Sequence, residues 1–402
     1  MSQPPFNGEP VPSSALDPFA LDVLRDPFPA QAQLRDLAPV VFLERYGVYA
    51  MARHAEVSAA LHDWKAFSSA RGVGIEDFAK VKAWRPKSIL LEADPPLHDR
   101  TRRVLARVMS PAAMRGLRAP FKAKAERLVD ALVAKRTFDA VPDLAEAYPL
   151  EVFPDAVGLR ADGRENLLPF STMVFNSFGP RNQLFHQATA AAEPVLAWIF
   201  AQCERDALSS DGFGAGIWAA HDAGEITAEE APILVRALLT AGLDTTVNGL
   251  SNAVFAFATH PEAWARLRAD RSLIKPAFDE VLRWQTPVQN FFRTTTRAVE
   301  IGGVTIPADA KVLLLLGAAN RDPRQWPDAD HFDVGRRPIG HVALGAGIHA
   351  CVGQLVARLE AELIFEALAD RIARFDLAGP VIHRLNNTLR GLGSLPIAVA
   401  SA

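Results

Sequence analysis

One short loop carries the residues with the greatest chemical potential in this chain. Gly345, Gly347 and Gly353 surround Cys351, which stands directly before an apolar helical pattern. Glycine tolerates positive φ angles and the close approach of a ligand to the backbone. Free amides at the start of a helix favour a thiolate over a thiol. The loop therefore suits a cysteine thiolate bonded to the iron of a flat ligand such as haem.

Two other interpretations of Cys351 are open from these residues alone. Free cysteine is among the most buried residue types, so a structural place in the core is the ordinary expectation. A nucleophilic Cys351 paired with His349 is the second alternative. The i, i+2 spacing beside a helix start does not naturally set an imidazole against a thiolate, which weighs against that pair.

Size and composition describe an ordinary globular protein. The chain has 402 residues, 49% apolar and 22% charged, and its net charge of -3 offers no nucleic-acid footprint. Its two cysteines, Cys203 and Cys351, exclude a disulfide framework and a four-cysteine zinc site. The first residues lack a signal-peptide pattern, and the longest apolar run, 312–319, is too short to span a membrane. We therefore expect a cytoplasmic protein without a membrane or nucleic-acid partner.

The elements that must position the loop are mainly helical. After an irregular segment of about thirty residues, a hairpin is predicted at 40–51, and helical periodicity dominates from about 111 to 272. A capping box at 227–230 begins a helix predicted to continue to about 258. Within it, the poor helical stretch 241–246 predicts a local kink with a polar pocket.

The last third of the chain mixes strands with one more helix. Strand-like segments stand at 291–296, 299–306 and 312–316, and Cys351 is predicted to start a final amphipathic helix. No repeat or linker interrupts the chain. We expect residues 1–402 to form one compact domain of helices with a few strands.

Two pairs of charged residues are uninformative alone. Glu280 and Arg283 share a helical face at i, i+3, but such pairs decorate many exposed helices. His98 and Arg102, at i, i+4, place two cationic donors on one face, which suits a carboxylate or phosphate. The ordinary alternative for that pair is a solvated basic face.

The combination is more specific than its parts. Over residues 35 to 400 the order and spacing of these residues resemble the bacterial cytochromes P450, the haem-thiolate monooxygenases. The resemblance rests on Asp-Pro-Pro-Leu-His98 with Arg102, Ala-Gly-Leu-Asp244-Thr245, Glu280 with Arg283, Arg293, Phe332–Arg336 and the glycine–cysteine loop. One departure is Leu344, which replaces the aromatic residue usual seven positions before the cysteine.

The resemblance implies the fold and the cofactor site. The fold would be mainly α with small β-sheets, a helix-rich prism around a buried haem b. Cys351, in the loop from Gly345 to Gly353, would be the proximal iron ligand. Four residues would donate hydrogen bonds to the haem propionates: His98, Arg102, Arg293 and His349. A buried charged triad would consist of Glu280, Arg283 and Arg336. Asp244 and Thr245 would be the acid–alcohol pair that delivers protons to dioxygen.

The resemblance also implies redox partners. The chain has no flavin or iron–sulfur motif, so electrons would come from a separate ferredoxin and an NAD(P)H-dependent ferredoxin reductase. Arg103, Arg337 and Arg358 are candidates for meeting an acidic ferredoxin, against the ordinary interpretation as solvated surface arginines.

Four segments resemble a narrower subgroup, the bacterial enzymes that oxidise para-substituted benzoates such as 4-methoxybenzoate: 68–74, 84–88, 175–180 and 286–293. The subgroup implies that Arg85 and Ser88 hold the substrate carboxylate. Its ring would be clamped by four apolar residues, Phe175, Phe178, Val288 and Phe291. The para substituent would then be hydroxylated or O-demethylated.

Helical spacing adds two small residues to this pocket. At about 100° per residue, Ala237 and Ala241 share a face with Asp244, whereas Arg236 falls off that face and is a candidate entrance cation. Ala237 replaces a serine of the subgroup, which removes one donor. Two rival hypotheses stay open: the same enzyme class acting on a terpenoid, fatty acid or natural product, and a non-catalytic haem sensor or carrier.

Overall fold

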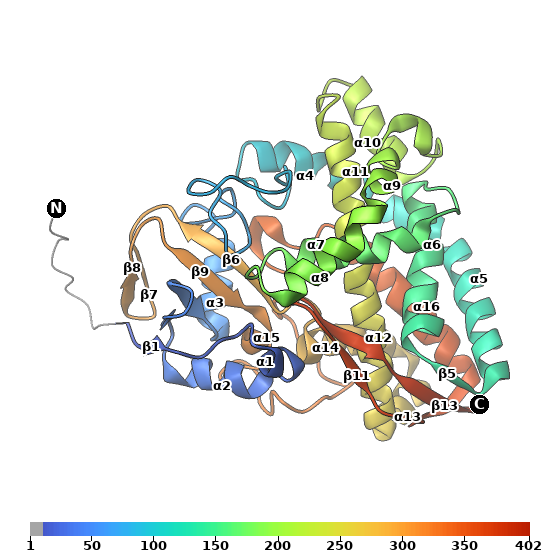
Figure 1. Ribbon diagram of the computed structural model, residues 1–402. Coiled ribbons are helices and arrows are strands. Elements are labelled where there is room, and N and C mark those ends of the chain that lie inside the picture. The colour runs from blue at the N-terminus through green and yellow to red at the C-terminus, as the bar shows by residue number, and fades with distance from the viewer. Residues whose placement is uncertain (1–10) are drawn as a thin grey trace, which may run out of the picture.

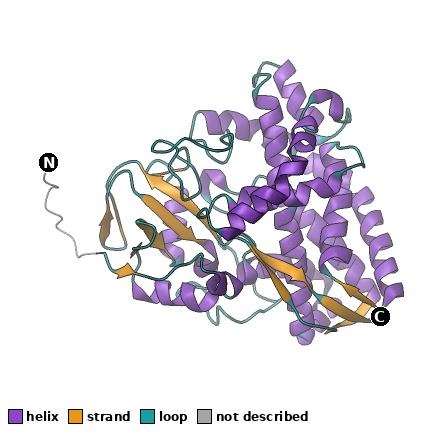
Figure 2. Ribbon diagram, viewed as in Figure 1, coloured by secondary structure: helices purple, strands orange, loops and turns teal. Residues whose placement is uncertain are grey.

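Helices dominate the protein (Figure 2), whose computed structural model describes residues 11–402. The α-helices are α1 (Leu21–Arg25), α2 (Phe28–Leu37), α3 (His54–His62), α4 (Leu97–Val108), α5 (Pro111–Lys135), α6 (Ala147–Val157), α7 (Leu167–Asn176), α8 (Gln183–Ala192), α9 (Leu196–Ala201), α10 (Phe213–Asp222), α11 (Glu230–Ala241), α12 (Asp244–Thr259), α13 (Pro261–Ala269), α14 (Ile274–Gln285), α15 (Leu316–Asn320) and α16 (Gln354–Arg371). Short helices of other types are η1 (Val141–Glu146), η2 (Arg164–Asn166), η3 (Glu193–Val195), η4 (Arg205–Ala207), η5 (Arg271–Leu273) and η6 (Gly347–His349).

The strands form small sheets. They are β1 (Ser13–Ser14), β2 (Val41–Leu43), β3 (Val48–Met51), β4 (Phe67–Ser68), β5 (Thr137–Asp139), β6 (Asn290–Thr295), β7 (Val299–Ile301), β8 (Val304–Ile306), β9 (Lys311–Leu315), β10 (Ile372–Leu377), β11 (Ile382–Leu385), β12 (Arg390–Ser394) and β13 (Pro396–Ser401). The largest sheet has the order β1-β2-β3-β9-β6-β4, a second is β10-β13-β5, and β11-β12 and β7-β8 are hairpins. The expected class, mainly α with small sheets, is confirmed.

The two kinds of element occupy different sides of the molecule. The largest sheet lies with α2 and α3 on one side, and α5, α12 and α16 pack together on the other (Figure 1). The main core runs through the helical side and buries apolar side chains such as Phe121, Val254 and Phe365. Two smaller apolar clusters flank the sheet. The segments that carry the candidate site come from both sides.

Local sequence explains most of these boundaries. Strands β2 and β3 pair antiparallel as the predicted hairpin, and Gly47 in their turn has a φ of 62°. The segment 299–306, predicted as one strand-like piece, folds into the hairpin β7–β8. Its turn is Gly302-Gly303, with φ angles of 59° and 80°. A Gly-Gly pair between β-branched residues is a hairpin signal that the prediction did not use.

The long helix predicted from the capping box is two helices, so the expected kink is a complete break. Helix α11 ends at Ala241 and α12 begins at Asp244. A Cβ atom on Gly242 would overlap the Phe153 ring, so only glycine fits the break. At the other end, the Glu230 carboxylate accepts a 2.9 Å hydrogen bond from the Thr227 amide, which is one half of the predicted capping box.

The last helix does not start at Cys351, as predicted, but at Gln354. It is the last helix of the described chain, as predicted, and the strands β10 to β13 follow it. Of the N-terminal segment expected to be irregular, residues 1–10 lie outside the described part, and the remainder contains β1 and α1.

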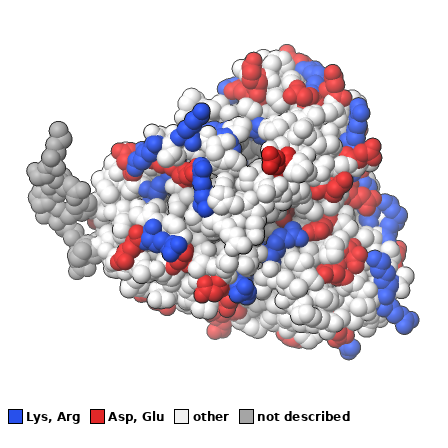
Figure 3. Space-filling view, in the orientation of Figure 1, with Lys and Arg blue, Asp and Glu red and all other residues white. Residues whose placement is uncertain are grey.

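Surface charge is mixed in sign. Figure 3 shows basic and acidic side chains interspersed over the face in view. Within residues 11–402, no helix combines the length and apolar character needed to cross a membrane.

Candidate functional site

The cysteine loop is held by its backbone. The Cys351 amide donates to the Leu344 carbonyl at 2.7 Å, and Gly345 and Gly347 have φ angles of 67° and 63°. A Cβ atom on Gly347 would collide with the Leu61 carbonyl oxygen, so glycine lets the loop press against α3. The Leu344 side chain itself packs on the edge of the main core.

The charge environment of Cys351 explains where α16 begins. Burial raises the pKa of its thiol, and the Gly353 and Gln354 amides act in the opposite direction by hydrogen bonding to the sulfur. The positive charges of Arg102 and Arg358 also lower that pKa. Because the first amides of α16 point at the sulfur, the cysteine must precede the helix rather than belong to it.

Two histidines with unused donors lie beside this loop. The rings of His98 on α4 and His349 on η6 meet edge to face, with centroids 4.6 Å apart. His98 uses Nδ1 on Asp99 at 3.1 Å. The Nε2 atoms of His98 and His349 are both buried and have no hydrogen-bond partner in the described part of the chain. Orphaned buried nitrogens of this kind point to a ligand that accepts hydrogen bonds.

Two arginines complete that cluster. Arg293 on β6 is 3% exposed, and burial lowers its pKa to about 10. Burial also lowers the pKa of His349 to about 2, and the charges of Arg293, His98 and Arg102 add to that effect. Four donors thus lie close together with little negative charge among them. The cluster fits the two propionates of a haem whose iron is bound by the Cys351 sulfur.

Glu280 and Arg283 on α14 form a charged triad with Arg336. Arg283 donates from Nε and Nη2 to both oxygens of Glu280, at 2.7 and 2.8 Å, and both side chains are 0% exposed. Arg336 Nε donates to Glu280 Oε1 at 3.1 Å. Arg283 also reaches the backbone carbonyls of Asn320 and Ala329. The structure therefore brings the three predicted residues together, with both guanidiniums in contact with the single Glu280 carboxylate.

The helix break carries the predicted acid and alcohol. Asp244 is 1% exposed, and burial raises its pKa to about 6. Its Oδ2 accepts from Thr172 Oγ1 at 3.1 Å, and Oδ1 has no hydrogen-bond partner in residues 11–402. Thr245 Oγ1 donates to the Ala241 carbonyl at 2.8 Å, across the break. Asp244 can therefore hold or release a proton near neutral pH.

Arg384 connects Asp244 to a second acid. Its Nη1 lies 3.9 Å from Asp244 Oδ1, while Nη2 donates to Glu146 Oε1 at 2.5 Å. The Arg384 side chain is 31% exposed, so it links the buried acid to the surface. Thr172, Arg384 and Glu146 were not predicted, because they come from α7, β11 and η1, far from Asp244 in the sequence.

The four apolar residues predicted for the substrate ring meet in one small cluster. Phe175 and Phe178 lie edge to face with centroids 5.8 Å apart, and Phe178 lies 5.7 Å from Phe291. Val288 packs against the same group, together with the unpredicted Leu389. Ala237 on α11 is half-buried and Ala241 is exposed.

The residues predicted to hold the substrate carboxylate, Arg85 and Ser88, adjoin this cluster. The Arg85 guanidinium lies over the Phe178 ring at 5.2 Å, but it also forms a bidentate pair with Glu92. Ser88 Oγ accepts from the Leu91 amide at 3.0 Å. Glu92 was not predicted, since an acid in a loop is usually solvated. Arg236 is close enough for the charge of Arg85 to lower its pKa, after the larger effect of burial.

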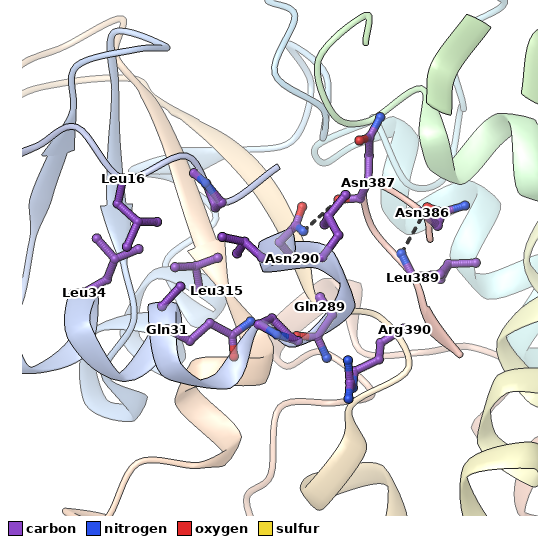
Figure 4. A pocket seen from close by; sticks show the side chains of 15 residues that line it. Leu16, Gln31, Leu34, Gln289, Asn290, Leu315, Asn386, Asn387, Leu389 and Arg390 are labelled. Carbon is purple, nitrogen blue, oxygen red and sulfur yellow. Dashed lines mark hydrogen bonds between the residues drawn. The ribbon is translucent and has the colours of Figure 1, made fainter. Parts of the chain in front are cut away.

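A separate small cavity lies between the N-terminal helices, β9 and the segment before β12 (Figure 4). Its volume of about 20 Å³ suits a water molecule. Gln31 Oε1 and Asn290 Oδ1, in its lining, have no hydrogen-bond partner in the described residues. It contains none of the predicted catalytic residues, so we interpret it as a hydration site.

Comparisons with known proteins identify the class. The family model "Cytochrome P450" matches residues 164–378. The chain is 55% identical over 403 residues to "Cytochrome p450 CYP199A2" of Rhodopseudomonas palustris, covering 100% of this chain and 98% of that protein. It is 31% identical over 388 residues to a beta-dihydromenaquinone-9 omega-hydroxylase of Mycobacterium tuberculosis, covering 95% of this chain and 78% of that protein.

Solved structures agree. Cytochrome P450 CREJ in complex with (4-ethylphenyl) dihydrogen phosphate has a TM-score of 0.86 at 27% identity, covering 96% of this chain and 99% of that one. CYP109Q5 from Chondromyces apiculatus has a TM-score of 0.80 at 32% identity, covering 96% and 98%. The chain belongs to the cytochrome P450 family. It is a monooxygenase that binds haem b and uses dioxygen and redox partners, with bacterial relatives such as CYP199A2. The carrier hypothesis is set aside.

Proposed function

We propose that this monooxygenase oxidises para-substituted benzoic acids such as 4-methoxybenzoate at the para substituent. The observation that carries the proposal is the Arg85 guanidinium over the Phe178 ring, at the edge of an apolar cluster. A cation beside aromatic walls suits a flat ring with one anionic end. The ligand named for CREJ is also a para-substituted aromatic with an anionic group.

The proposed roles follow from position. Cys351 binds the haem iron, and His98, Arg102, Arg293 and His349 hold the propionates. The haem, when bound, supplies dioxygen activation. Phe175, Phe178, Val288 and Phe291 clamp the substrate ring, with Ala237 and Ala241 as small residues on the α11 face. A substrate anchored at its acid end presents the para substituent to the reacting centre.

Asp244 and Thr245 are proposed to deliver protons. Asp244 takes a proton from the side of Arg384, whose head is partly exposed, and passes it toward Thr245. Its pKa of about 6 allows both uptake and release near neutral pH. One oxygen atom of dioxygen enters a C–H bond, and the other leaves as water with two protons and two electrons. A methoxy substrate then gives a hemiacetal that collapses to the phenol and formaldehyde.

A titration and a turnover assay test this function. We expect 4-methoxybenzoate to shift the ferric haem spectrum from low to high spin. The neutral control 4-methoxybenzamide should bind at least about tenfold more weakly, because it lacks the charge that Arg85 recognises. Turnover should release 4-hydroxybenzoate and formaldehyde in equal amounts. A spectrum that responds to a terpenoid or fatty acid, but not to 4-methoxybenzoate, would assign the other substrate class.

We further propose a ferredoxin and an NAD(P)H-dependent ferredoxin reductase as electron donors. Arg103 and Arg337 are exposed and available to an acidic protein, whereas Arg358 already pairs with Asp279 at 3.1 Å. R103E/R337E should lower the reduction rate by an acidic ferredoxin, most clearly at low salt, without changing substrate affinity. An unchanged rate would return both residues to ordinary surface arginines.

A further inference from the structure

One buried carboxylate ties together three parts of the pocket. Glu92, with a fully buried side chain, accepts from Arg85 Nη1 at 2.8 Å and from Nη2 at 2.7 Å. It also accepts from the Ser88 amide at 3.0 Å and from the Val73 amide at 3.4 Å. Val73 belongs to the same apolar cluster as Phe178. Glu92 thus fixes both residues proposed for the substrate acid and one wall of the pocket.

This arrangement leaves Arg85 with few N–H groups that are free to bind a ligand. A guanidinium has five N–H groups. Two go to Glu92, the Nε–H goes to Ser177 Oγ at 3.3 Å, and the second Nη1 hydrogen faces the Pro86 carbonyl at 3.3 Å. One N–H, on Nη2, stays available. The rings of Phe78 and Phe178, at 5.6 and 5.2 Å, hold the guanidinium.

Ser88 complements that single donor. Its hydroxyl oxygen accepts from the Leu91 amide at 3.0 Å and, more weakly, from the Leu90 amide at 3.4 Å. Both acceptor positions are therefore occupied, and the hydroxyl proton is the part that a ligand can use. Together, Arg85 and Ser88 offer two donors and no acceptor, which matches the two oxygens of a carboxylate.

We propose that Glu92 is a positioning residue for acid recognition, orienting Arg85 and Ser88 so that a substrate carboxylate receives one N–H and one O–H. The inference rests on the proposed function. Glu92 also balances charge: it is the carboxylate that Arg85 contacts in the described part of the chain, and Arg236 is a second cation nearby. Without Glu92 the repulsion between the two cations is no longer offset, and the long, flexible Arg85 side chain leaves its position.

Removing Glu92 has two opposite effects on an anionic substrate. It removes a negative charge, which favours binding, and it releases Arg85 and Ser88, which disfavours it. The freed Arg85 head moves away from the ligand and takes its positive charge with it, so the loss of orientation dominates. E92Q should therefore weaken acid binding although it makes the pocket more positive.

Spin-shift titrations of the haem-loaded full chain test this inference. E92Q should raise the Kd of 4-methoxybenzoate at least about tenfold and change that of the neutral 4-methoxybenzamide less than about threefold. E92D keeps the charge but cannot span the same donors, so it should give an intermediate loss and serves if E92Q folds poorly. E76Q is the matched control, because Glu76 pairs with an exposed arginine, Arg181, at 2.7 Å; its Kd should equal that of the wild type.

A double-mutant cycle separates positioning from general damage. If Glu92 acts mainly through Arg85, E92Q should raise the Kd for the acid much less in an R85M background, where only the orientation of Ser88 is still lost. Additive losses, an unchanged Kd in E92Q, or tighter acid binding would each overturn the inference while leaving the proposed function intact. Wild-type protein that does not respond to 4-methoxybenzoate would overturn the proposed function first.

Discussion

The donors around the Cys351 loop and the Arg85 end of the pocket are both built from buried cations, and they differ in what balances those cations. Arg293 is buried without a carboxylate in contact, and the Nε2 atoms of His98 and His349 have no partner in the described residues. Arg85, in contrast, is paired with the Glu92 carboxylate and donates further to Ser177 and the Pro86 carbonyl, which leaves one N–H on Nη2 for a ligand.

This difference follows from how long each ligand stays. A cofactor that is bound throughout the life of the enzyme can supply the missing acceptors, so the protein leaves those donors unpaired. A substrate leaves after each turnover, and an unpaired buried cation would then cost several kcal/mol. The Arg85 end, proposed to bind the substrate acid, satisfies its own charges and leaves single donors for the ligand. Paired and unpaired cations therefore distinguish the two kinds of binding site.

The largest effect is expected when the ion pair between Arg85 and Glu92 is broken. R85M removes the cation and leaves the fully buried Glu92 carboxylate without its ion-pair partner, with only the more distant charge of Lys311 nearby. We expect the free energy of unfolding of the apoprotein to fall by about 3 to 5 kcal/mol. Urea denaturation at neutral pH measures it, and R85M/E92Q should recover most of the loss. An R85M protein as stable as wild type would show that the pair is not a structural unit.

The next largest effect is expected at Asp244, a buried carboxylate in which Oδ2 accepts a hydrogen bond and Oδ1 has no hydrogen-bond partner in the described residues. Its pKa is about 6 in the folded protein and 3.8 in an unstructured peptide, so the folded protein holds a proton that the unfolded chain releases. This stabilisation is complete below about pH 4 and is lost as the pH rises through 6. Relative to D244N, the wild-type apoprotein should lose about 3 kcal/mol of unfolding free energy between pH 4 and pH 7. Parallel pH profiles would place the Asp244 pKa near its ordinary value.

Loss of Arg293, the cation without an ion pair in the described residues, should not lower the stability of the apoprotein as loss of Arg85 does. R293M removes a buried cation that forms no ion pair in the described residues and feels only the more distant charge of Asp94, so the apoprotein should be no less stable than wild type. The haem, however, loses a charge-assisted hydrogen bond, and its dissociation should accelerate about tenfold. Transfer of haem to apomyoglobin measures that rate. An apoprotein clearly destabilised by R293M would remove the contrast with Arg85.

The smallest effect is expected at Thr245, which belongs neither to the Arg85–Glu92 pair nor to the donors around the Cys351 loop. T245A removes a hydroxyl that donates to the Ala241 carbonyl, and we expect haem binding and substrate Kd to stay the same. Product formed per NADH should fall about two- to tenfold while released hydrogen peroxide rises, because proton delivery becomes less selective. Coupling that survives this change would contradict the proton-delivery role of Thr245.

Much of the cofactor side could be predicted from sequence. Cys351, His98, Arg102 and Arg293 stand at spacings that resemble one family, and each needs a particular side-chain chemistry. The break before Asp244 was also visible, because glycine and β-branched residues interrupt a helical pattern. The exact start of α16 was not, since the amides that face the Cys351 sulfur are known only once the loop is folded.

The substrate side was less predictable. Phe175, Phe178 and Phe291 were predicted as ring contacts and lie together in the structure, but nothing in the sequence distinguishes Glu92 from a solvated loop acid. Its burial depends on the approach of Arg85, Val73 and the Ser88 turn, which are tertiary contacts. Thr172 and Arg384 were missed for the same reason, because they reach Asp244 from distant segments.

The hydrogen bond from the Cys351 amide to the Leu344 carbonyl has a consequence for mutational tolerance. The contact is made by the main chain, so almost any residue at position 344 can supply it. The side chain there packs on the edge of the main core and takes no part in this hydrogen bond. A change of side chain at this position is therefore a nearly neutral step in evolution for the geometry of the loop, whereas a change at Gly347 is a forbidden one.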